Sequence, residues 1–203
     1  MRPSDIEDVI LRRAYSELPV DADMRSRISR TIFRLLCREG DVMAWRTAEA
    51  LGDWVARIRP RDPDYAQEIL RRLAWSLNDE SGSTPWMSAE AMAEIGVGAL
   101  DLIEPFVGII LSHYHDVAPR GAIWAAGRIG PLRPDWFQDF IPDLLAALDS
   151  LEPTIRGHAV WALGRLGIAI PEEKSALLAN DAATFWIYRD GELVAATVSE
   201  ISV

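Results

Sequence analysis

The chain has 203 residues, of which 49% are hydrophobic and 26% are charged, a balance typical of a globular protein with one sizeable core. Its formal net charge is −10, and the excess of acids lies after residue 80, where 7 basic residues face 16 acids. A protein that grips duplex DNA through many phosphates normally carries a basic surface, so this balance argues against nucleic acid as a partner.

The sequence shows no targeting or membrane-spanning segment. MRPSDIEDVILRR, at the amino terminus, carries acids through its first apolar turn, and the most apolar stretch, 107–111, is far too short to cross a bilayer. We therefore expect a cytoplasmic protein with no membrane partner. The single cysteine, Cys37, excludes an internal disulfide and lies on an apolar helical segment, where a buried thiol is the usual outcome.

Polar capping residues and a helical apolar period predict four helices in the first 80 residues. In chain order they are a helix to about Leu18 with a capping box at Ser4 and Glu7, a helix capped by Asp21 or Asp23 that ends at Gly40, a helix from Asp41 to Pro60, and a helix from Asp62 to Asn78. Short links join these helices, which is typical of stacked helical hairpins.

An internal repeat organises the middle of the chain. The segments MAWRTAEALGDWV (43–55), TPWMSAEAMAEIG (84–96), APRGAIWAAGRIG (118–130) and IRGHAVWALGRLG (155–167) share one frame, with steps of 41, 34 and 37 residues. In that frame small residues coincide at Gly52, Ala93, Gly127 and Gly164. A small residue at a regular period is what stacked helices need where one lies close against the next.

The fourth segment resembles the VRxxAAxALGxIG helix of HEAT repeats, especially the short HEAT-like repeats named after phycobilisome lyases. The third fits with Ala118 and Pro119 replacing Val and Arg, and FIPDLLAALDS (140–150) resembles the second helix of such a repeat. The resemblance covers about residues 41–170. It implies a right-handed α-solenoid of helical hairpins over residues 1–180 and, usually, protein binding, and it implies no catalytic residue because the repeat signature is structural.

Residues 181–203 depart from the helical pattern. TFWIYRDGELVAATV alternates apolar and polar residues around Asp190 and Gly191, the dipeptide favoured in a two-residue hairpin turn. Because a lone hairpin is only marginally stable, we expect it to cap the last repeat or to dock on a partner. The expected fold is thus all-α with a small C-terminal β-hairpin.

Residues at i, i+4 and i+8 of the repeat frame share a helix face and predict four neighbouring stripes. These are Trp45, Glu49 and Asp53; Trp86, Glu90 and Glu94; Arg120, Trp124 and Arg128; and Trp161 and Arg165. One hypothesis is that the stripes line a groove for a partner protein, since Trp and Arg are frequent interface anchors. The alternative is an internal ladder, in which each Trp stacks on a neighbouring helix and each Arg pairs with a nearby acid.

The loop LNDESGSTPW (77–86) is a second candidate site. Asn78, Asp79 and Glu80 could face a cation or a basic partner, and NDESG followed by a Trp and EAM resembles a stretch of bacterial HEAT-repeat proteins. The loop lacks the alternating ligand spacing of an EF-hand, and the alternative is helix capping with a solvated turn.

Two other groups of residues are weaker candidates. His113 and His115 face different directions on a helix, and His158 lies a repeat away, so we expect neither a metal nor a cofactor. A basic stripe along the second predicted helix could hold phosphates but is more often a solvated face; it consists of Arg27, Arg30, Arg34 and Arg38.

These patterns favour a non-enzymatic binding module whose surface docks another protein. The alternatives are HEAT-like enzymes: a bilin lyase, or an alkylpurine DNA glycosylase in which Trp124, Trp161 and an acid such as Glu90 or Asp53 would act on a damaged nucleotide. The acidic net charge argues against the glycosylase, and no pattern indicates a bilin site. The identity of the partner and the oligomeric state stay open.

Overall fold

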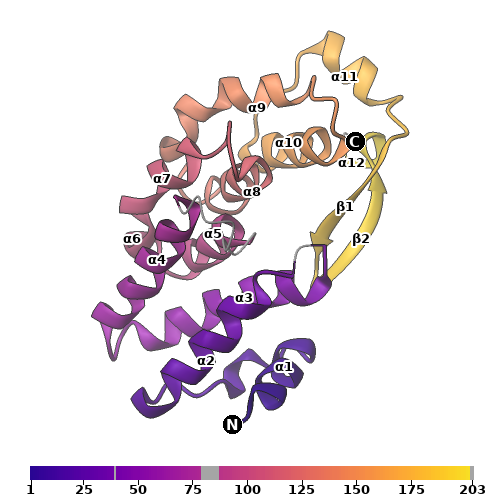
Figure 1. Ribbon diagram of the computed structural model, residues 1–203. Helices are drawn as coiled ribbons and strands as arrows, with labels where there is room; N and C mark the ends of the chain where they lie inside the picture. Colours follow the sequence, from indigo (N-terminus) through magenta and orange to yellow (C-terminus); the bar gives the residue numbers. More distant parts are fainter. Residues whose placement is uncertain (39, 79–86, 202–203) are drawn as a thin grey trace.

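The computed structural model describes residues 1–38, 40–78 and 87–201, which are mostly helical and end in a two-stranded hairpin (Figure 1). The α-helices are α1 (Pro3–Leu11), α2 (Ala22–Leu35), α3 (Val42–Ile58), α4 (Pro63–Leu77), α5 (Ser88–Gly98), α6 (Leu100–Ile103), α7 (Val107–Ser112), α8 (Pro119–Ile129), α9 (Ile141–Ala147), α10 (Pro153–Leu166), α11 (Glu172–Leu178) and α12 (Val198–Ile201). Short 3₁₀ segments span Tyr15–Glu17, Glu104–Phe106 and Pro134–Phe140.

The predicted caps are confirmed for α3 and α4. The Asp41 carboxylate accepts a hydrogen bond from the Met43 backbone N–H at 2.8 Å, and the Asp62 carboxylate accepts one from the Tyr65 N–H at 3.0 Å. Each aspartate thereby satisfies a donor that the first helical turn leaves unpaired. Proline at the start of α4 adds a φ angle that is already helical.

The boundaries of the first two helices differ from the prediction. The α1 helix begins at Pro3, so Arg2 rather than Ser4 is the N-cap residue, and the Asp5 carboxylate accepts a hydrogen bond from the Arg2 N–H at 2.7 Å. It ends at Leu11 rather than near residue 18, and Arg13 has a left-handed φ of 56°. The α2 helix ends at Leu35, short of Gly40.

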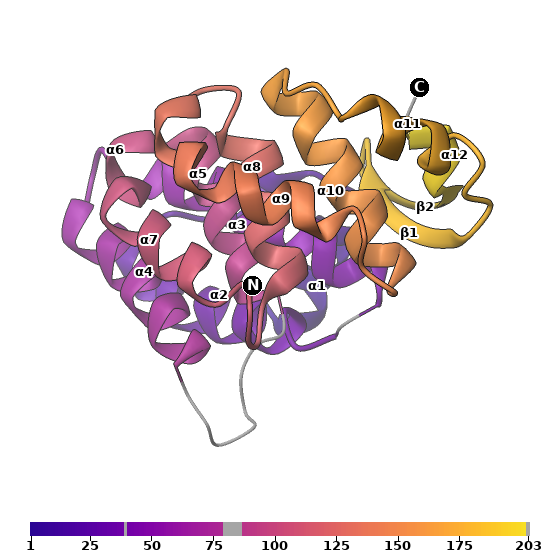
Figure 2. The ribbon, with the colours of Figure 1, turned by 90° about the horizontal axis from the view of Figure 1, so that it is seen from above.

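Helices α3, α5, α8 and α10, which contain the repeat-frame segments, lie side by side in one row (Figures 1 and 2). Helices α4, α7 and α9 form a second layer along one side of this row. Two glycines of the frame, Gly52 and Gly127, lie where helices approach closely: a Cβ at Gly52 would overlap the Glu94 backbone, and one at Gly127 would overlap the Trp161 ring of the next helix. Gly164 is in the last helix of the row, and a Cβ there would meet nothing within 4 Å.

The hairpin consists of β1 (Thr184–Arg189) and β2 (Glu192–Thr197), paired antiparallel with Arg189 opposite Glu192. Its turn at Asp190 and Gly191, predicted from the sequence, has positive φ angles of 54° and 89°. Strand β1 packs on α10, as expected for a cap over the last repeat. The hairpin also extends along the row to α3, where Arg46 donates a hydrogen bond to the Gly191 carbonyl at 2.8 Å.

A continuous core of buried side chains runs from α1 to the hairpin. The prediction of a buried thiol is wrong, because Cys37 lies just beyond the end of α2 and its side chain is exposed. Within the described ranges, no helix has both the length and the apolar composition that a bilayer crossing requires.

Candidate functional site

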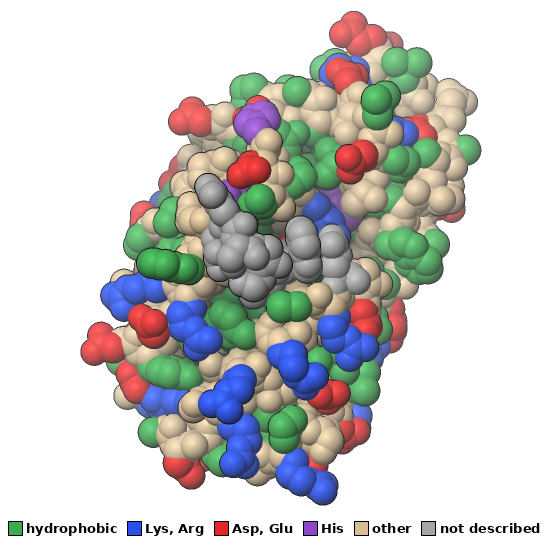
Figure 3. Space-filling model, viewed as in Figure 1, with side chains coloured by type: hydrophobic (Ala, Val, Ile, Leu, Met, Phe, Trp, Pro, Cys, Tyr) green, Lys and Arg blue, Asp and Glu red, His purple; other side chains and the backbone are tan. Residues whose placement is uncertain are grey.

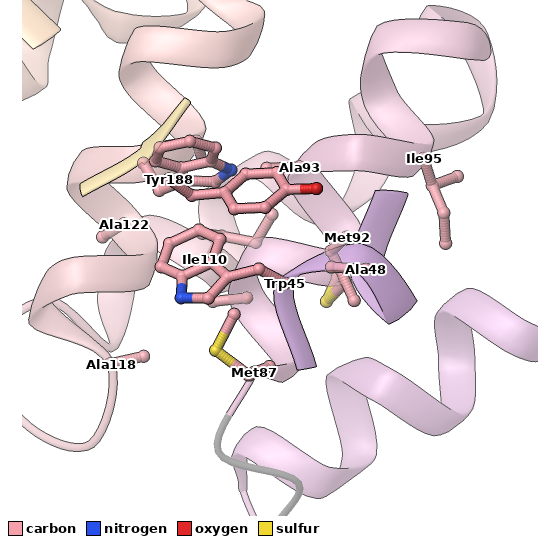
Figure 4. Packing of buried hydrophobic residues seen from close by; sticks show 14 of the residues in the cluster. Trp45, Ala48, Met87, Met92, Ala93, Ile95, Ile110, Ala118, Ala122 and Tyr188 are labelled. Carbon is pink, nitrogen blue, oxygen red and sulfur yellow. The ribbon is translucent and has the colours of Figure 1, made fainter. Parts of the chain in front are cut away.

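Four aromatic rings from α3, α8, α10 and β1 pack together at the centre of the row. This aromatic cluster consists of Trp45, Trp124, Trp161 and Tyr188. The Trp124 and Trp161 rings stack at 4.6 Å between centroids, and Trp45 meets Trp124 edge to face at 4.7 Å. Tyr188, from the hairpin, lies flat over Trp45 at 5.3 Å (Figure 4). Both stacked and edge-to-face geometries are favourable for aromatic pairs.

Glu94 of α5 contacts both Trp124 of the aromatic cluster and Arg128, which lie on the next helix of the row, α8. Its carboxylate accepts hydrogen bonds from Trp124 Nε1 at 2.9 Å and from Arg128 Nε and Nη2 at 2.8 and 2.7 Å. Burial disfavours the charged form of Arg128, but the hydrogen bonds and charge of Glu94 outweigh it and raise the pKa of the guanidinium. The buried carboxylate is therefore fully paired.

Glu49 ties the hairpin to the first helices. Its carboxylate accepts hydrogen bonds from the hydroxyls of Tyr15 and Tyr188 at 2.6 and 2.9 Å and from the Arg13 guanidinium. Burial favours the protonated form of Glu49, yet the hydrogen bonds from Tyr15, Arg13 and Tyr188 together lower its pKa. Burial, followed by the charge of Glu49, raises the pKa of Tyr188 above its usual range.

Glu90 and Arg120 form a second buried ion pair, with Arg120 Nε 2.8 Å from Glu90 Oε1. The Arg120 guanidinium also lies over the Trp45 ring at 5.3 Å. Within the described part of the chain, the buried Glu90 Oε2 has no hydrogen-bond partner. It lies at a cavity of about 330 Å³ beside the first turns of α8 and α10.

The described residues of the predicted stripes are thus mostly buried or partly buried rather than exposed to solvent. Trp45 and Trp124 are only 3% exposed, because the hairpin covers them, and this is the arrangement of the internal ladder. Trp161 is partly exposed, and Asp53 pairs within its own helix with Arg57 at 2.7 Å. Trp86, Asp79 and Glu80 lie outside the described residues. Asn78 is exposed at the end of α4, and its amide donates to the Ala74 carbonyl at 2.9 Å.

One part of the predicted surface is open at the edge of the hairpin. This edge pocket has a volume of about 260 Å³ and is lined by Arg13, Glu49, Glu94, Trp124, Arg128, Trp161, Arg165, Tyr188, Arg189 and Asp190. Arg165 and Arg189 form no ion pair with any carboxylate in the described ranges, whereas Arg13 and Arg128 pair with the two glutamates of the floor. The pocket therefore presents two uncompensated guanidinium groups beside an indole ring.

Sequence reasoning did not identify Arg13, Tyr15, Tyr188 and Arg189 as members of this site. Strand alternation gave no signal for Tyr188, because it places residue 188 on the same side as the exposed Trp186 and opposite the buried residues 185 and 187. Arg13 and Tyr15 gave no periodic signal either, because Arg13 follows the end of α1 and Tyr15 begins a short 3₁₀ segment.

The described residues contain no group of three or more metal-binding side chains close enough to share an ion. His158 is fully buried between Trp124 and Phe185, and its Nδ1 lies 2.7 Å from the Thr154 carbonyl oxygen. His113 Nδ1 is within 2.8 Å of the Ile109 carbonyl oxygen of its own helix. In both residues this nitrogen is occupied by a local backbone contact.

The chain was also compared with known proteins. No protein-family model and no curated protein sequence matches it.

Proposed function

We propose that the chain is a HEAT-like α-solenoid that serves as a non-enzymatic protein-binding module. The regular row of α3, α5, α8 and α10 supports this assignment, as does the contact of Gly127 with the neighbouring Trp161. In a HEAT-like array, helices that repeat a small residue stack closely and give a rigid surface for a partner.

The edge pocket carries the functional part of the proposal. Its uncompensated arginines, Arg165 and Arg189, point to an anionic ligand, and a guanidinium binds a carboxylate with two parallel hydrogen bonds. The volume of about 260 Å³ suits one side chain rather than a large cofactor. We therefore propose that an Asp or Glu side chain of a partner protein enters the pocket next to Trp161.

The burial of the aromatic cluster supports binding over base chemistry. A glycosylase-like reaction requires aromatic rings that can stack on an extruded base, and Trp124 is 3% exposed beneath the hairpin. Glu94, the acid nearest to that ring, is committed to Trp124 and Arg128.

The test compares the wild-type chain with a double variant, Arg165→Glu with Arg189→Glu, and with Arg61→Glu as a matched charge control. Arg61 is exposed in the link between α3 and α4 and lies outside the pocket. Each tagged protein would be used to capture proteins from a cell extract, and the captured protein would then be purified and titrated against all three.

We expect the wild type and Arg61→Glu to bind the same protein, and the double variant to bind it at least tenfold more weakly, because two attractive charges become repulsive. A circular-dichroism spectrum would show that all three chains are folded. Equal affinity of the three chains for the captured protein, or no capture above resin alone, would overturn the proposal.

A further inference from the structure

Another cavity lies away from the edge pocket, between α2 and α4. This basic groove has a volume of about 680 Å³ and is lined by Phe33, Arg34, Cys37, Glu68, Arg71, Arg72, Trp75 and Ser76. Its apolar part is formed by Phe33 in the last turn of α2, by Cys37 just beyond that helix and by Trp75 in the last turn of α4. Trp75 is 77% exposed, the largest exposed aromatic surface of the described residues.

Arginines surround this apolar part. Figure 3 shows basic side chains gathered over the face that α2 and α4 form. Arg72 is held in place over the Phe33 ring at 4.2 Å and donates a hydrogen bond to Ser29 at 3.0 Å. Arg30, one turn before Arg34, pairs with no carboxylate of the described ranges. Of the basic stripe noted in the sequence, Arg34 lines the groove, together with Arg71 and Arg72 of α4.

The charges of the groove are only partly compensated within the chain. Arg34 pairs with Glu7, and Arg71 lies 3.5 Å from Glu68, but both arginine side chains remain more than half exposed. Exposed pairs of this kind contribute little and exchange readily for other carboxylates. The face is therefore locally positive on a chain whose net charge is −10.

We propose that the basic groove docks an acidic amphipathic helix of a partner protein. An apolar side chain of that helix would enter between Phe33 and Trp75, and its carboxylates would pair with Arg34, Arg71 and Arg72. A groove between two helices that combines an aromatic anchor with a charged rim suits this mode of recognition. The groove shares no residue with the edge pocket, so the proposal stands independently of the function proposed above.

The arrangement of charges around the basic groove favours an acidic peptide over single-stranded nucleic acid as its ligand. A strand of nucleic acid would stack bases on Trp75 and track its phosphates along a continuous basic path. Here Glu7 and Glu68 interrupt the path, and the acidic net charge of the chain opposes long-range attraction of a polyanion.

Synthetic peptides of about 16 residues, long enough to form a helix on binding, provide the probe. One set carries Leu or Phe at positions i, i+3, i+4 and i+7 with Glu elsewhere, and a matched set carries Lys in place of Glu. Binding of each labelled peptide to the full chain would be followed by fluorescence anisotropy, with a thymidine oligonucleotide as the nucleic-acid probe.

We expect members of the acidic set to bind at least tenfold more tightly than their Lys counterparts, and Trp75→Ala to weaken that binding at least fivefold. Trp186→Ala, which removes an exposed ring from the hairpin, should leave it unchanged. The double variant Arg34→Glu with Arg71→Glu should reverse the preference and bind the Lys peptides, which loss of structure alone would not produce.

The single thiol gives a second readout of groove occupancy. Cys37 is exposed and lines the groove, and a docked helix should slow its reaction with a thiol reagent at least fivefold at saturating peptide. The proposal is overturned if acidic and Lys peptides bind alike, if no peptide binds, if Trp75→Ala binds as the wild type does, or if the oligonucleotide binds more tightly than the acidic peptides.

Discussion

Glu94 is a single buried residue that holds two side chains of the neighbouring helix in place. Its carboxylate is almost completely buried and accepts hydrogen bonds from Trp124 Nε1 and from Nε and Nη2 of Arg128. Removing water from a carboxylate is costly, and the cost is offset only while every one of these donors stays in place. The pair therefore fixes the relative position of α5 and α8 more strictly than apolar contacts would.

We expect Glu94→Gln to lower the free energy of unfolding by about 2 kcal/mol, because it leaves the partly buried Arg128 without a counter-charge. Urea unfolding monitored by circular dichroism measures this change. Asp149→Asn, which breaks an exposed pair with Lys174, is the control and should change the value by less than about 0.5 kcal/mol. A loss for Glu94→Gln no larger than for the control would contradict the buried pairing.

His158 gives a pH dependence whose sign follows from its burial. Burial lowers the pKa of its imidazole to about 4, whereas an exposed histidine titrates near 6.5. Above about pH 6.5 neither state of the chain binds the proton, and between about 6.5 and 4 only the unfolded state does. The free energy of unfolding should therefore decrease as the pH falls through this interval, by about 3 kcal/mol.

Urea unfolding at about pH 7 and about pH 4.5 tests the His158 contribution. The wild type should lose more stability between the two values than His158→Gln, which has no titrating group at this position. His115→Gln removes an exposed histidine and should follow the wild type. Identical losses in the wild type and in His158→Gln would show that this residue is not the source.

At the scale of elements, two glycines of the repeat frame allow the effect of helix packing on stability to be distinguished from the effect of helix propensity. Gly127 and Gly164 occupy the same position of the frame, but only Gly127 has a neighbouring helix against it, and there the Trp161 ring fills the space of a Cβ. Gly127→Ala should lower the free energy of unfolding by about 1 to 3 kcal/mol through overpacking.

Gly164→Ala should have the opposite effect and raise the free energy of unfolding by up to about 1 kcal/mol, because alanine favours an open helical position. Thermal unfolding of the two variants measures both signs in one experiment. A gain for both variants would mean that α8 and α10 do not approach each other closely at Gly127.

The hairpin contacts the helices through both faces of strand β1. Phe185 packs on His158 from one face, and Tyr188 on the opposite face contacts Trp45 and Glu49, whereas Trp186 is 61% exposed. We expect Tyr188→Ala to cost about 2 to 3 kcal/mol and to increase quenching of tryptophan fluorescence by an aqueous quencher, because Trp45 loses its cover. Trp186→Ala should change stability by less than about 0.5 kcal/mol. Unchanged quenching in Tyr188→Ala would contradict the covering role of the hairpin.

Local chemistry explains which elements the sequence predicts well. The caps at Asp41 and Asp62 and the turn at Asp190 and Gly191 depend on neighbouring residues, and they are confirmed. The ends of α1 and α2 were misjudged because the apolar pattern continues beyond the last helical residue. The wrong prediction of a buried Cys37 has the same cause: α2 ends before this residue, and its side chain is exposed.

At the scale of the whole molecule, the part of the site that sequence could predict follows from the repeat frame. The frame placed Trp124 and Trp161 on one face of successive helices, and their rings do stack. It could not show that the hairpin covers this face, because that depends on contacts between residues far apart in the chain, such as Tyr188 with Glu49. The remaining opening, the edge pocket, is defined by the same distant contacts.

The hairpin also changes how the row should unfold. In a simple repeat array each helix pair contacts only its neighbours, so the ends can unfold first. Here one element contacts both α10 and, through Arg46, the first helix of the row. We expect one urea transition, with the same midpoint by circular dichroism and by tryptophan fluorescence. Separate midpoints would show that the two ends unfold independently.

The cover over the aromatic cluster has a consequence for synthesis on the ribosome. Tyr188 is made 139 residues after Glu49, its hydrogen-bond partner beside Trp45. At about 5 to 20 residues per second, translation needs roughly 7 to 30 s to reach it. Throughout that interval the indole of Trp45 lacks the cover of Tyr188, which only the arrival of the hairpin supplies.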